Sequence, residues 1–287
     1  MNAGASRELA ERLLARPFRV ERPITVDQTN ESIVVDDHVV VKWLRPPVPA
    51  PHPGVELIRH LAGRGFTEMP ALLGVEQRDG VVSAIVTEYL PGAVDGWDWF
   101  VDDAVAWLDG DLPFDALVSS ARTISAITAR VHEALADLDA AEVDLAPLAE
   151  RALGDLDLAV NRLEGMEWLD REAVLTALHQ LRGGRVPGHR IHGDLHVGPF
   201  LRAGSKVLLT DFDGNPLLDA ADRALPQSPL RDLASLVQSI VHVGAVVVRR
   251  RRPGRAAEVD HFVARAVEAA LSEYRSSFEV DEGLLLA

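Results

Sequence analysis

The first third of the chain alternates short apolar runs with turn residues, a pattern that predicts an antiparallel sheet. Residues 7–15 have the apolar spacing of a short helix. Residues 18–44 (FRVERPITV, then SIVVDDHVVVKWL) are rich in Val and Ile and predict strands that meet at a turn at 36–37. After a proline-rich break at 45–54, VELIRHLAGRGF is spaced as a helix. The following ALLGVEQRDGVVSAIVTEYL then predicts two strands joined by a tight Asp-Gly turn.

Beyond this region the apolar positions recur at helical spacing. We expect helices over 98–108, 114–138 and 145–182, and two more after residue 230. Between them, VPGHRIHGDLHVGPFLRAGSKVLLTDFDGNP predicts a short hairpin with polar residues at its ends. The expected class is therefore α+β, a two-lobed fold with a small antiparallel-sheet lobe (residues 1–90) and a mostly helical lobe (91–287). Ligand clefts often lie at such junctions.

Composition excludes several functional classes. The formal charge of −15 argues against a nucleic-acid partner, because phosphate backbones favour basic surfaces. A chain without cysteine has no disulfide, thiolate metal site or cysteine nucleophile. The N-terminus lacks the apolar core of a signal peptide, and no run of about 18 or more apolar residues suggests a membrane span. We expect a cytoplasmic protein, and interpret the basic run at 249–252 as a solvated helix end.

The segment IHGDLHVGPF (191–200) allows two interpretations. As a strand it would place His192, Asp194 and His196 on one face, as in a metal chelate. As a loop it would present Asp194 as a catalytic base. Seventeen residues later an apolar run ends in Asp211-Phe-Asp213-Gly, which places carboxylates at a strand terminus. Phosphoryl transfer uses one carboxylate at the acceptor hydroxyl and another that holds Mg²⁺, so the two motifs together favour the second interpretation.

The sheet lobe contains the cation that such chemistry needs. Only two of the 29 basic residues are lysines, and Lys42 lies in the strand-like run VVVKWL. Glu56, on the next helix, is the predicted carboxylate partner of Lys42. The preceding turn, DQTNES, lacks a GxGxxG pattern but offers Thr29, Asn30 and Ser32 to phosphates; a plain polar turn is an equal alternative.

Taken together, QTNESIVV, HPGVELIRHLAGRGF, TEYLPGAVDGWDW, HGDLHVGPFL, DFDGNP and SPLRDLASLV resemble the aminoglycoside-phosphotransferase-like small-molecule kinases. The nearer resemblance is to the maltokinase-like branch, which includes actinobacterial glucosamine kinases. The resemblance implies a kinase fold that uses ATP and Mg²⁺, with Asp194 as base and Asp211 as a metal ligand. It also implies a hinge of Glu88, Tyr89 and Leu90 that holds adenine through backbone groups.

The chain departs from these kinases at Pro199. Five residues after the base they place Asn or Gln as a second metal ligand, whereas a proline side chain cannot coordinate. Asp213 is the better replacement because Mg²⁺ prefers oxygen, and His196 is a second candidate. Maltokinases also carry an N-terminal cap and a longer C-terminal segment, which weakens the expectation of maltose as substrate.

The acceptor site is expected in the helical lobe. DGWDWF joins carboxylates to aromatic faces, as sugar sites often do, although its tryptophans could instead pack between the lobes. The candidate substrate-binding residues are Asp95, Trp97, His192, Asp194, Arg231, Asp232, Glu273 and Arg275. An acidic pocket suits an ammonium group. Together with the family resemblance, this predicts ATP-dependent phosphorylation of a small amino sugar, D-glucosamine at its 6-hydroxyl.

Four alternatives stay open from the sequence. The acceptor could be maltose or another neutral sugar, or an aminoglycoside antibiotic. Pro199 is compatible with a nucleotide-binding pseudokinase that does not turn over. A metal-dependent hydrolase or oxygenase could use His192, Asp194 and His196 as a facial ligand set.

Overall fold

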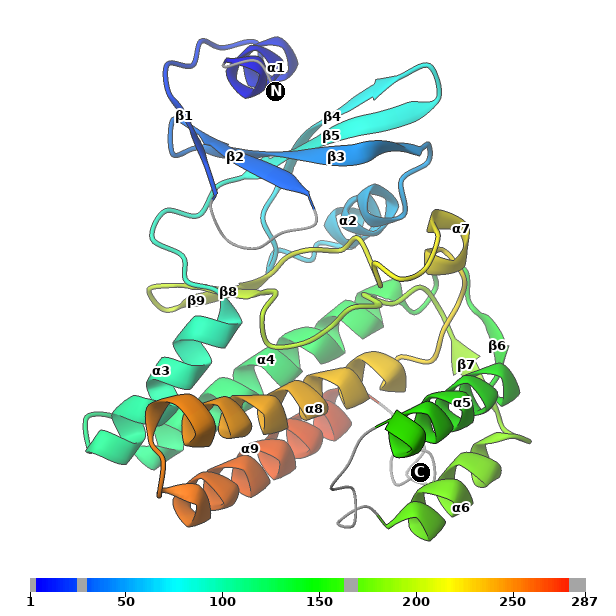
Figure 1. Cartoon of the computed structure of the whole chain (residues 1–287). Coiled ribbons are helices and arrows are strands. Elements are labelled where there is room, and N and C mark those ends of the chain that lie inside the picture. The colour runs from blue at the N-terminus through cyan, green and yellow to red at the C-terminus, as the bar shows by residue number, and fades with distance from the viewer. Residues whose placement is uncertain (1–3, 25–29, 163–169, 279–287) are drawn as a thin grey trace.

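The structure is a computed structural model that describes residues 4–24, 30–162 and 170–278. Figure 1 shows an antiparallel sheet with its two flanking helices above a larger helical part, with the polar hairpin between them. The predicted α+β, two-lobed class is confirmed. The boundary at residues 90 and 91 stays a prediction.

The sheet of the smaller lobe has five antiparallel strands in the order β1-β2-β3-β5-β4. Both predicted turns are present, and Asp36, Asp37 and Asp79 adopt positive φ there, which Asp tolerates better than most residues. The strands are β1 (Glu21–Pro23), β2 (Glu31–Val35), β3 (Val39–Pro49), β4 (Leu72–Arg78) and β5 (Val81–Glu88).

Strand β3 continues into the proline-rich segment that was predicted to be a break. Val48 and Pro49 pair with Val82 and Val81 of β5, beyond a register shift that lies between Trp43 and Val48. The shift spans the two prolines at 46 and 47, which have no N–H to donate to a ladder. An irregular ladder therefore allows the strand to pass them.

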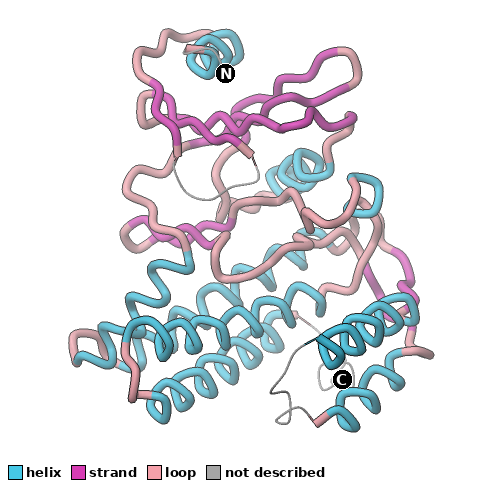
Figure 2. Tube along the Cα trace, in the orientation of Figure 1, coloured by secondary structure: helices cyan, strands magenta, loops and turns pink. Residues whose placement is uncertain are grey.

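Two helices cover opposite faces of this sheet (Figures 1 and 2). Leu9 of α1 (Ala5–Leu14) packs in one apolar cluster with Val39 and Val41 of β3. Val55 of α2 (Pro53–Gly63) packs on the other face. Lys42 alternates with Val41 along the strand, so its side chain points to the α2 face.

The helical lobe is built around α4 and α9, which pack against α3 and α8 through one apolar core. A π-helical turn (Val247–Arg251) extends α8, and there Arg251 pairs with Asp102 of α3. Arg252 pairs with Asp109. The helices are α3 (Gly96–Asp109), α4 (Phe114–Leu135), α5 (Ala146–Arg162), α6 (Arg171–Leu181), α7 (Ala220–Arg223), α8 (Leu230–Val246) and α9 (Ala256–Ser277).

Three short elements were missed from the sequence. Strands β6 (Ala141–Asp144) and β7 (Arg185–Gly188) form a two-stranded ribbon, and α7 is a single turn after the DFDG motif. None of them has enough residues to show an apolar period. The predicted hairpin is present as β8 (Phe200–Ala203) and β9 (Lys206–Leu209).

Within the described residues, one helical stretch is long and apolar enough to cross a membrane by length and composition, Leu230–Arg251. It is a helix of the lobe's core, because Leu233, Leu236, Ile240 and Val243 on it are fully buried.

Candidate active site

Residues 191–199 form a loop and not a strand, so the alternating His-Asp-His pattern does not have the regular one-sided spacing of a strand. We call residues 191–199, between β7 and β8, the catalytic loop. His192 is 1% exposed; its Nδ1 accepts from Asp194 N at 3.4 Å, and its Nε2 lies 3.0 Å from the Thr210 carbonyl oxygen. Gly193 has φ +83°, in the left-handed region that favours glycine. Both ring nitrogens of His192 are thus engaged, and within the described residues His192, Asp194 and His196 do not form a group that could hold a metal ion.

Asp194 is the residue predicted to act as the base. It is half-buried, and desolvation raises its pKa, although the neighbouring His196 and His192 pull the other way. Asp211 is among the charges that act on Asp194, so the HGDLH and DFDG motifs meet at one site. A carboxylate whose pKa is raised is a stronger proton acceptor than a fully solvated one.

Lys42 joins the sheet lobe to the DFDG motif. Its Nζ lies 2.6 Å from Asp211 Oδ1 and 2.6 Å from Asp213 Oδ2. Burial alone would lower the pKa of Lys42, but the charges of Asp213 and Asp211 outweigh it and raise the pKa above its ordinary value. Burial would likewise raise the pKa of Asp211, yet the charge of Lys42 holds it below its usual range.

The predicted pair between Lys42 and Glu56 is not what the structure contains, and this part of the prediction is corrected. Glu56 Oε2 lies instead 3.5 Å from Nη1 of Arg190, which is 3% exposed at the start of the catalytic loop. Arg190 Nη1 also lies 3.4 Å from Asp139 Oδ2, and Arg190 Nη2 donates to the Pro53 carbonyl oxygen at 3.2 Å. A buried guanidinium needs such compensation, and Glu56 at the N-terminus of α2 provides it.

The donor set at Lys42 fits Mg²⁺. Two carboxylate oxygens converge on one cationic atom, and Mg²⁺ is commonly bound by one or two carboxylates together with water and substrate phosphates. In the described part of the chain no group of three or more His, Asp or Glu side chains is arranged around a metal position. That finding is consistent with a Mg²⁺ site whose remaining ligands come from the phosphates of the nucleotide and from water. The side chain of Pro199 adds no ligand.

The hinge predicted at Glu88–Leu90 carries backbone groups toward the junction of the lobes. Glu88 N donates to Ala71 O, and Tyr89 N donates to His38 O, both at 2.9 Å. Leu90 N has no hydrogen-bond partner among the described residues. A free backbone donor here is what an adenine ring requires. Thr29 of the preceding polar turn lies outside the described residues. Ser32 is buried on β2 directly opposite Lys42, and its place in the site stays a prediction.

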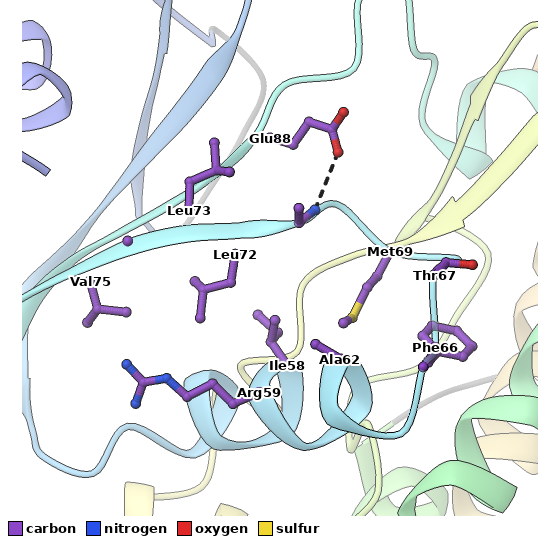
Figure 3. A pocket seen from close by; sticks show the side chains of 13 residues that line it. Ile58, Arg59, Ala62, Phe66, Thr67, Met69, Leu72, Leu73, Val75 and Glu88 are labelled. Atoms are coloured by element: carbon purple, nitrogen blue, oxygen red, sulfur yellow. Dashed lines mark hydrogen bonds between the residues drawn. The ribbon is translucent and has the colours of Figure 1, made fainter. Parts of the chain in front are cut away.

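A cavity of about 690 Å³ lies between α2 and the edge strand β4 (Figure 3). It is lined mainly by apolar side chains, with Arg59 and Glu88 at its margin. Lys42, Asp194 and Asp211 are not part of its lining, so its size alone does not mark it as the reaction site.

The start of α3 abuts the catalytic loop. Asp95 caps the helix by accepting from Trp97 N (2.9 Å) and Asp98 N (3.2 Å). The Trp97 ring stacks on His196 with centroids 5.6 Å apart. A Cβ on Gly96 would lie 1.7 Å from the Val197 carbonyl oxygen, so only glycine permits this approach. The structure thus brings Asp95 and Trp97 beside the loop that carries Asp194.

The other predicted acceptor residues separate into two groups. Asp232, 1% exposed, accepts backbone hydrogen bonds from His192 N (2.8 Å) and Gly193 N (2.9 Å). The predicted substrate contacts of Asp232 and His192 are therefore corrected: both side chains are enclosed and hold the loop.

Glu273 and Arg275 flank a buried tyrosine on α9, and Arg231 lies on α8 beside Gln227, its hydrogen-bond partner. Contact of these three with substrate stays a prediction.

Several residues that shape the site were not found from the sequence. His132 of α4 lies 3.2 Å from Asp232 through its Nε2. Ser239 Oγ accepts from Val197 N at 3.0 Å. Arg223 of α7 binds the carbonyl oxygens of residues 213, 216 and 218, which folds the segment after the DFDG motif. Each is an isolated polar residue on a helix, and only its packing reveals its role.

Comparison with known proteins shows which proteins this chain is similar to in sequence. No protein-family model matches it. It is 40% identical over 280 residues to a glucosamine kinase of Streptacidiphilus jiangxiensis, with 92% of this chain and 64% of that protein covered. It is 39% identical over 258 residues to a glucosamine kinase of Mycolicibacterium smegmatis, covering 84% and 64%. The chain thus spans less than two thirds of these curated relatives.

Comparison with solved structures gives the same result as comparison of sequences. A glucosamine kinase in complex with glucosamine, ADP and inorganic phosphate superposes with a TM-score of 0.83 and 34% identity, over 99% of this chain and 76% of that one. The GDP complex of aminoglycoside 2'-phosphotransferase-IIIa, at 15% identity and a TM-score of 0.51, shares only the fold, over 100% of this chain and 97% of that one. Fold and site together define a two-lobed protein of the small-molecule-kinase class. Within that class, the chain belongs to the glucosamine kinase family.

Proposed function

We propose that this chain transfers the terminal phosphoryl group of ATP to the 6-hydroxyl of D-glucosamine. The observation that carries the proposal is the convergence of Lys42 on Asp211 and Asp213 beside Asp194, the half-buried base of the catalytic loop. Membership of the glucosamine kinase family supports the choice of acceptor. A solved relative was captured with glucosamine, ADP and inorganic phosphate.

The chain's own groups divide the work of the reaction. Asp194 accepts the proton of the acceptor hydroxyl while the new oxygen–phosphorus bond forms and the bond to the ADP oxygen breaks. The products are glucosamine 6-phosphate, ADP and a proton. Lys42 steadies the phosphates, and the free Leu90 N–H orients the adenine.

Asp211 and Asp213 would hold Mg²⁺, with His196 as a further candidate. When bound, the ion neutralises charge on the phosphates. Burial lowers the pKa of His196, which favours the neutral imidazole that a metal requires. Its Nδ1 already accepts from Gly198 N at 3.0 Å, so only Nε2 could reach an ion.

Selection of an amino sugar is assigned to the start of α3. The charge of Asp95, with burial and the charge of Asp102, raises the pKa of Asp98, which indicates a concentration of negative charge. An ammonium group relieves such repulsion, whereas a neutral hydroxyl at the same carbon does not. Trp97 adds an apolar face of the kind that packs against sugar rings.

Pro199 favours one second candidate, a nucleotide-binding module without turnover. The position carries no metal-coordinating group, so the nucleotide could bind without reaching a reactive geometry. In that case calorimetry would detect ATP binding, and no ADP would form when glucosamine is added.

The test of the proposed function is product identification. We expect the chain, incubated with ATP, Mg²⁺ and D-glucosamine, to yield a phosphomonoester whose ³¹P nucleus couples to the two protons on carbon 6 in a ¹H–³¹P correlation spectrum. Coupling to another ring proton would reject the 6-hydroxyl. Absence of any sugar phosphate, with ATP bound, would favour the second candidate.

We also place the reaction in the cytoplasm. ATP is available there, and the apolar stretch at Leu230–Arg251 is used inside the helical core.

A further inference from the structure

A chain of buried polar groups connects the C-terminal helix to the catalytic loop. It consists of Tyr274 on α9, His132 on α4 and Asp232 on α8, which are 0%, 0% and 1% exposed. Tyr274 Oη lies 2.6 Å from His132 Nδ1, and His132 Nε2 lies 3.2 Å from Asp232 Oδ2. Three helices far apart in the sequence thus meet through two consecutive side-chain hydrogen bonds.

The direction of these hydrogen bonds follows from the charge of Asp232. Burial alone would raise the pKa of this carboxyl, but the hydrogen bond from His132 and the amide of Gly193 hold it below its usual range. As a carboxylate, Asp232 can only accept, so the proton of His132 is on Nε2. In the neutral imidazole, Nδ1 then accepts from the phenol of Tyr274, whose pKa burial raises well above its ordinary value. Tyr274 therefore supports the tautomer of His132 that Asp232 requires, with the proton on Nε2 and a donor at Nδ1.

The hydroxyl of Tyr274 is not explained by packing. The side chain lies in an apolar cluster with Ala129 and Leu233, where phenylalanine would bury the same ring. A buried hydroxyl is costly unless it is hydrogen-bonded, and here its partner is His132. The hydroxyl therefore matters for its hydrogen bond to His132, and through His132 for Asp232.

Asp232 connects these hydrogen bonds to the loop that carries Asp194. Its two oxygens accept the N–H groups of His192 and Gly193, the residues directly before Asp194. If His132 turned or changed tautomer, the carboxylate would lose its third donor and could rotate away from these amides. We propose that Tyr274 is a positioning residue that fixes Asp194 through His132 and Asp232; the effect on turnover rests on the proposed kinase function.

The test compares two conservative variants that each remove one buried hydroxyl between α4 and α9. Tyr274→Phe breaks the bond to His132. Ser125→Ala breaks the bond from Ser125 Oγ to Ala270 O (2.6 Å), which leads nowhere near the catalytic loop. We expect Tyr274→Phe to lower kcat about tenfold, because small displacements of a reacting group are costly. The KM values for ATP and glucosamine should stay within about twofold of wild type, and Ser125→Ala should change neither constant by more than that.

A double-variant cycle and hydrogen exchange separate positioning from loss of stability. In a His132→Gln background, Tyr274→Phe should add no further loss of kcat, since its path to Asp232 is already broken. Amide exchange in a peptide spanning 190–196 should accelerate in Tyr274→Phe and not in Ser125→Ala. Exchange needs no substrate, so it reports on the positioning even if glucosamine is not phosphorylated. Equal exchange in both variants, or additive losses of kcat, would overturn the proposal.

Discussion

Replacement of Asp194 by alanine is expected to lower kcat for glucosamine phosphorylation by about 10²–10⁴-fold, the usual contribution of a positioned general base. Binding of ATP should remain within about twofold of wild type, because the groups assigned to the nucleotide and its metal ion, Lys42, Leu90, Asp211 and Asp213, stay in place when Asp194 is shortened. Steady-state kinetics and calorimetry with ATP measure the two quantities. Turnover at the wild-type rate would remove Asp194 from the reaction.

The pH dependence of the wild type provides an independent check on the same residue. Desolvation raises the pKa of Asp194 in the folded protein, and only the ionised carboxylate accepts a proton. The kcat should therefore fall as the pH drops through this raised pKa, on a limb that lies above the range of a solvated Asp. Asp219, an exposed helix cap near α7, offers a matched carboxylate: Asp219→Ala should keep the wild-type profile.

The second large effect is expected from Lys42→Met. Loss of the ammonium leaves Asp211 and Asp213 facing each other without the cation that now lies 2.6 Å from both, and it removes a positive charge from the phosphates. We expect kcat/KM for ATP to fall about 10²–10³-fold, as for other groups that stabilise developing charge.

The chain provides its own control for this change. Lys206, the only other lysine, is exposed at the start of β9, and Lys206→Met should leave kcat/KM within about twofold of wild type. Equal effects of the two substitutions would mean that Lys42 contributes only to the net charge of the protein and not to a specific contact with the phosphates.

The sequence predicted much of the fold because long elements repeat their apolar period many times. The helices over 98–108 and 114–138 extend in the structure over Gly96–Asp109 and Phe114–Leu135, and the turn at 36–37 follows from two aspartates between Val-rich runs. The four residues of β6 and of β7 contain no such repeat. The continuation of β3 to Pro49 depends on pairing with β5, a long-range interaction that no local pattern encodes.

For the site, short motifs indicated the reacting carboxylates, while their supporting contacts required the packed structure. HGDLH and DFDG pointed to Asp194 and Asp211 because the two motifs occur together, seventeen residues apart and joined by a hairpin; either motif alone is also common in ordinary turns and loops. The same motifs could not show that His192 is enclosed, or that Asp232 serves the loop and not the sugar. Glu56 was assigned to Lys42 because phosphoryl transfer needs a helix carboxylate beside the strand cation, but in the structure it pairs with the buried Arg190.

Discrimination between glucosamine and glucose tests the central claim most directly, because the two sugars differ only in the group on carbon 2. ADP release should be followed with ATP, Mg²⁺ and a panel of glucosamine, glucose, maltose and kanamycin. We predict that kcat/KM for glucosamine exceeds that for glucose by at least about tenfold, with maltose and kanamycin poorer still. Equal rates with glucose, or turnover of maltose alone, would contradict the assignment of this chain as an amino-sugar kinase.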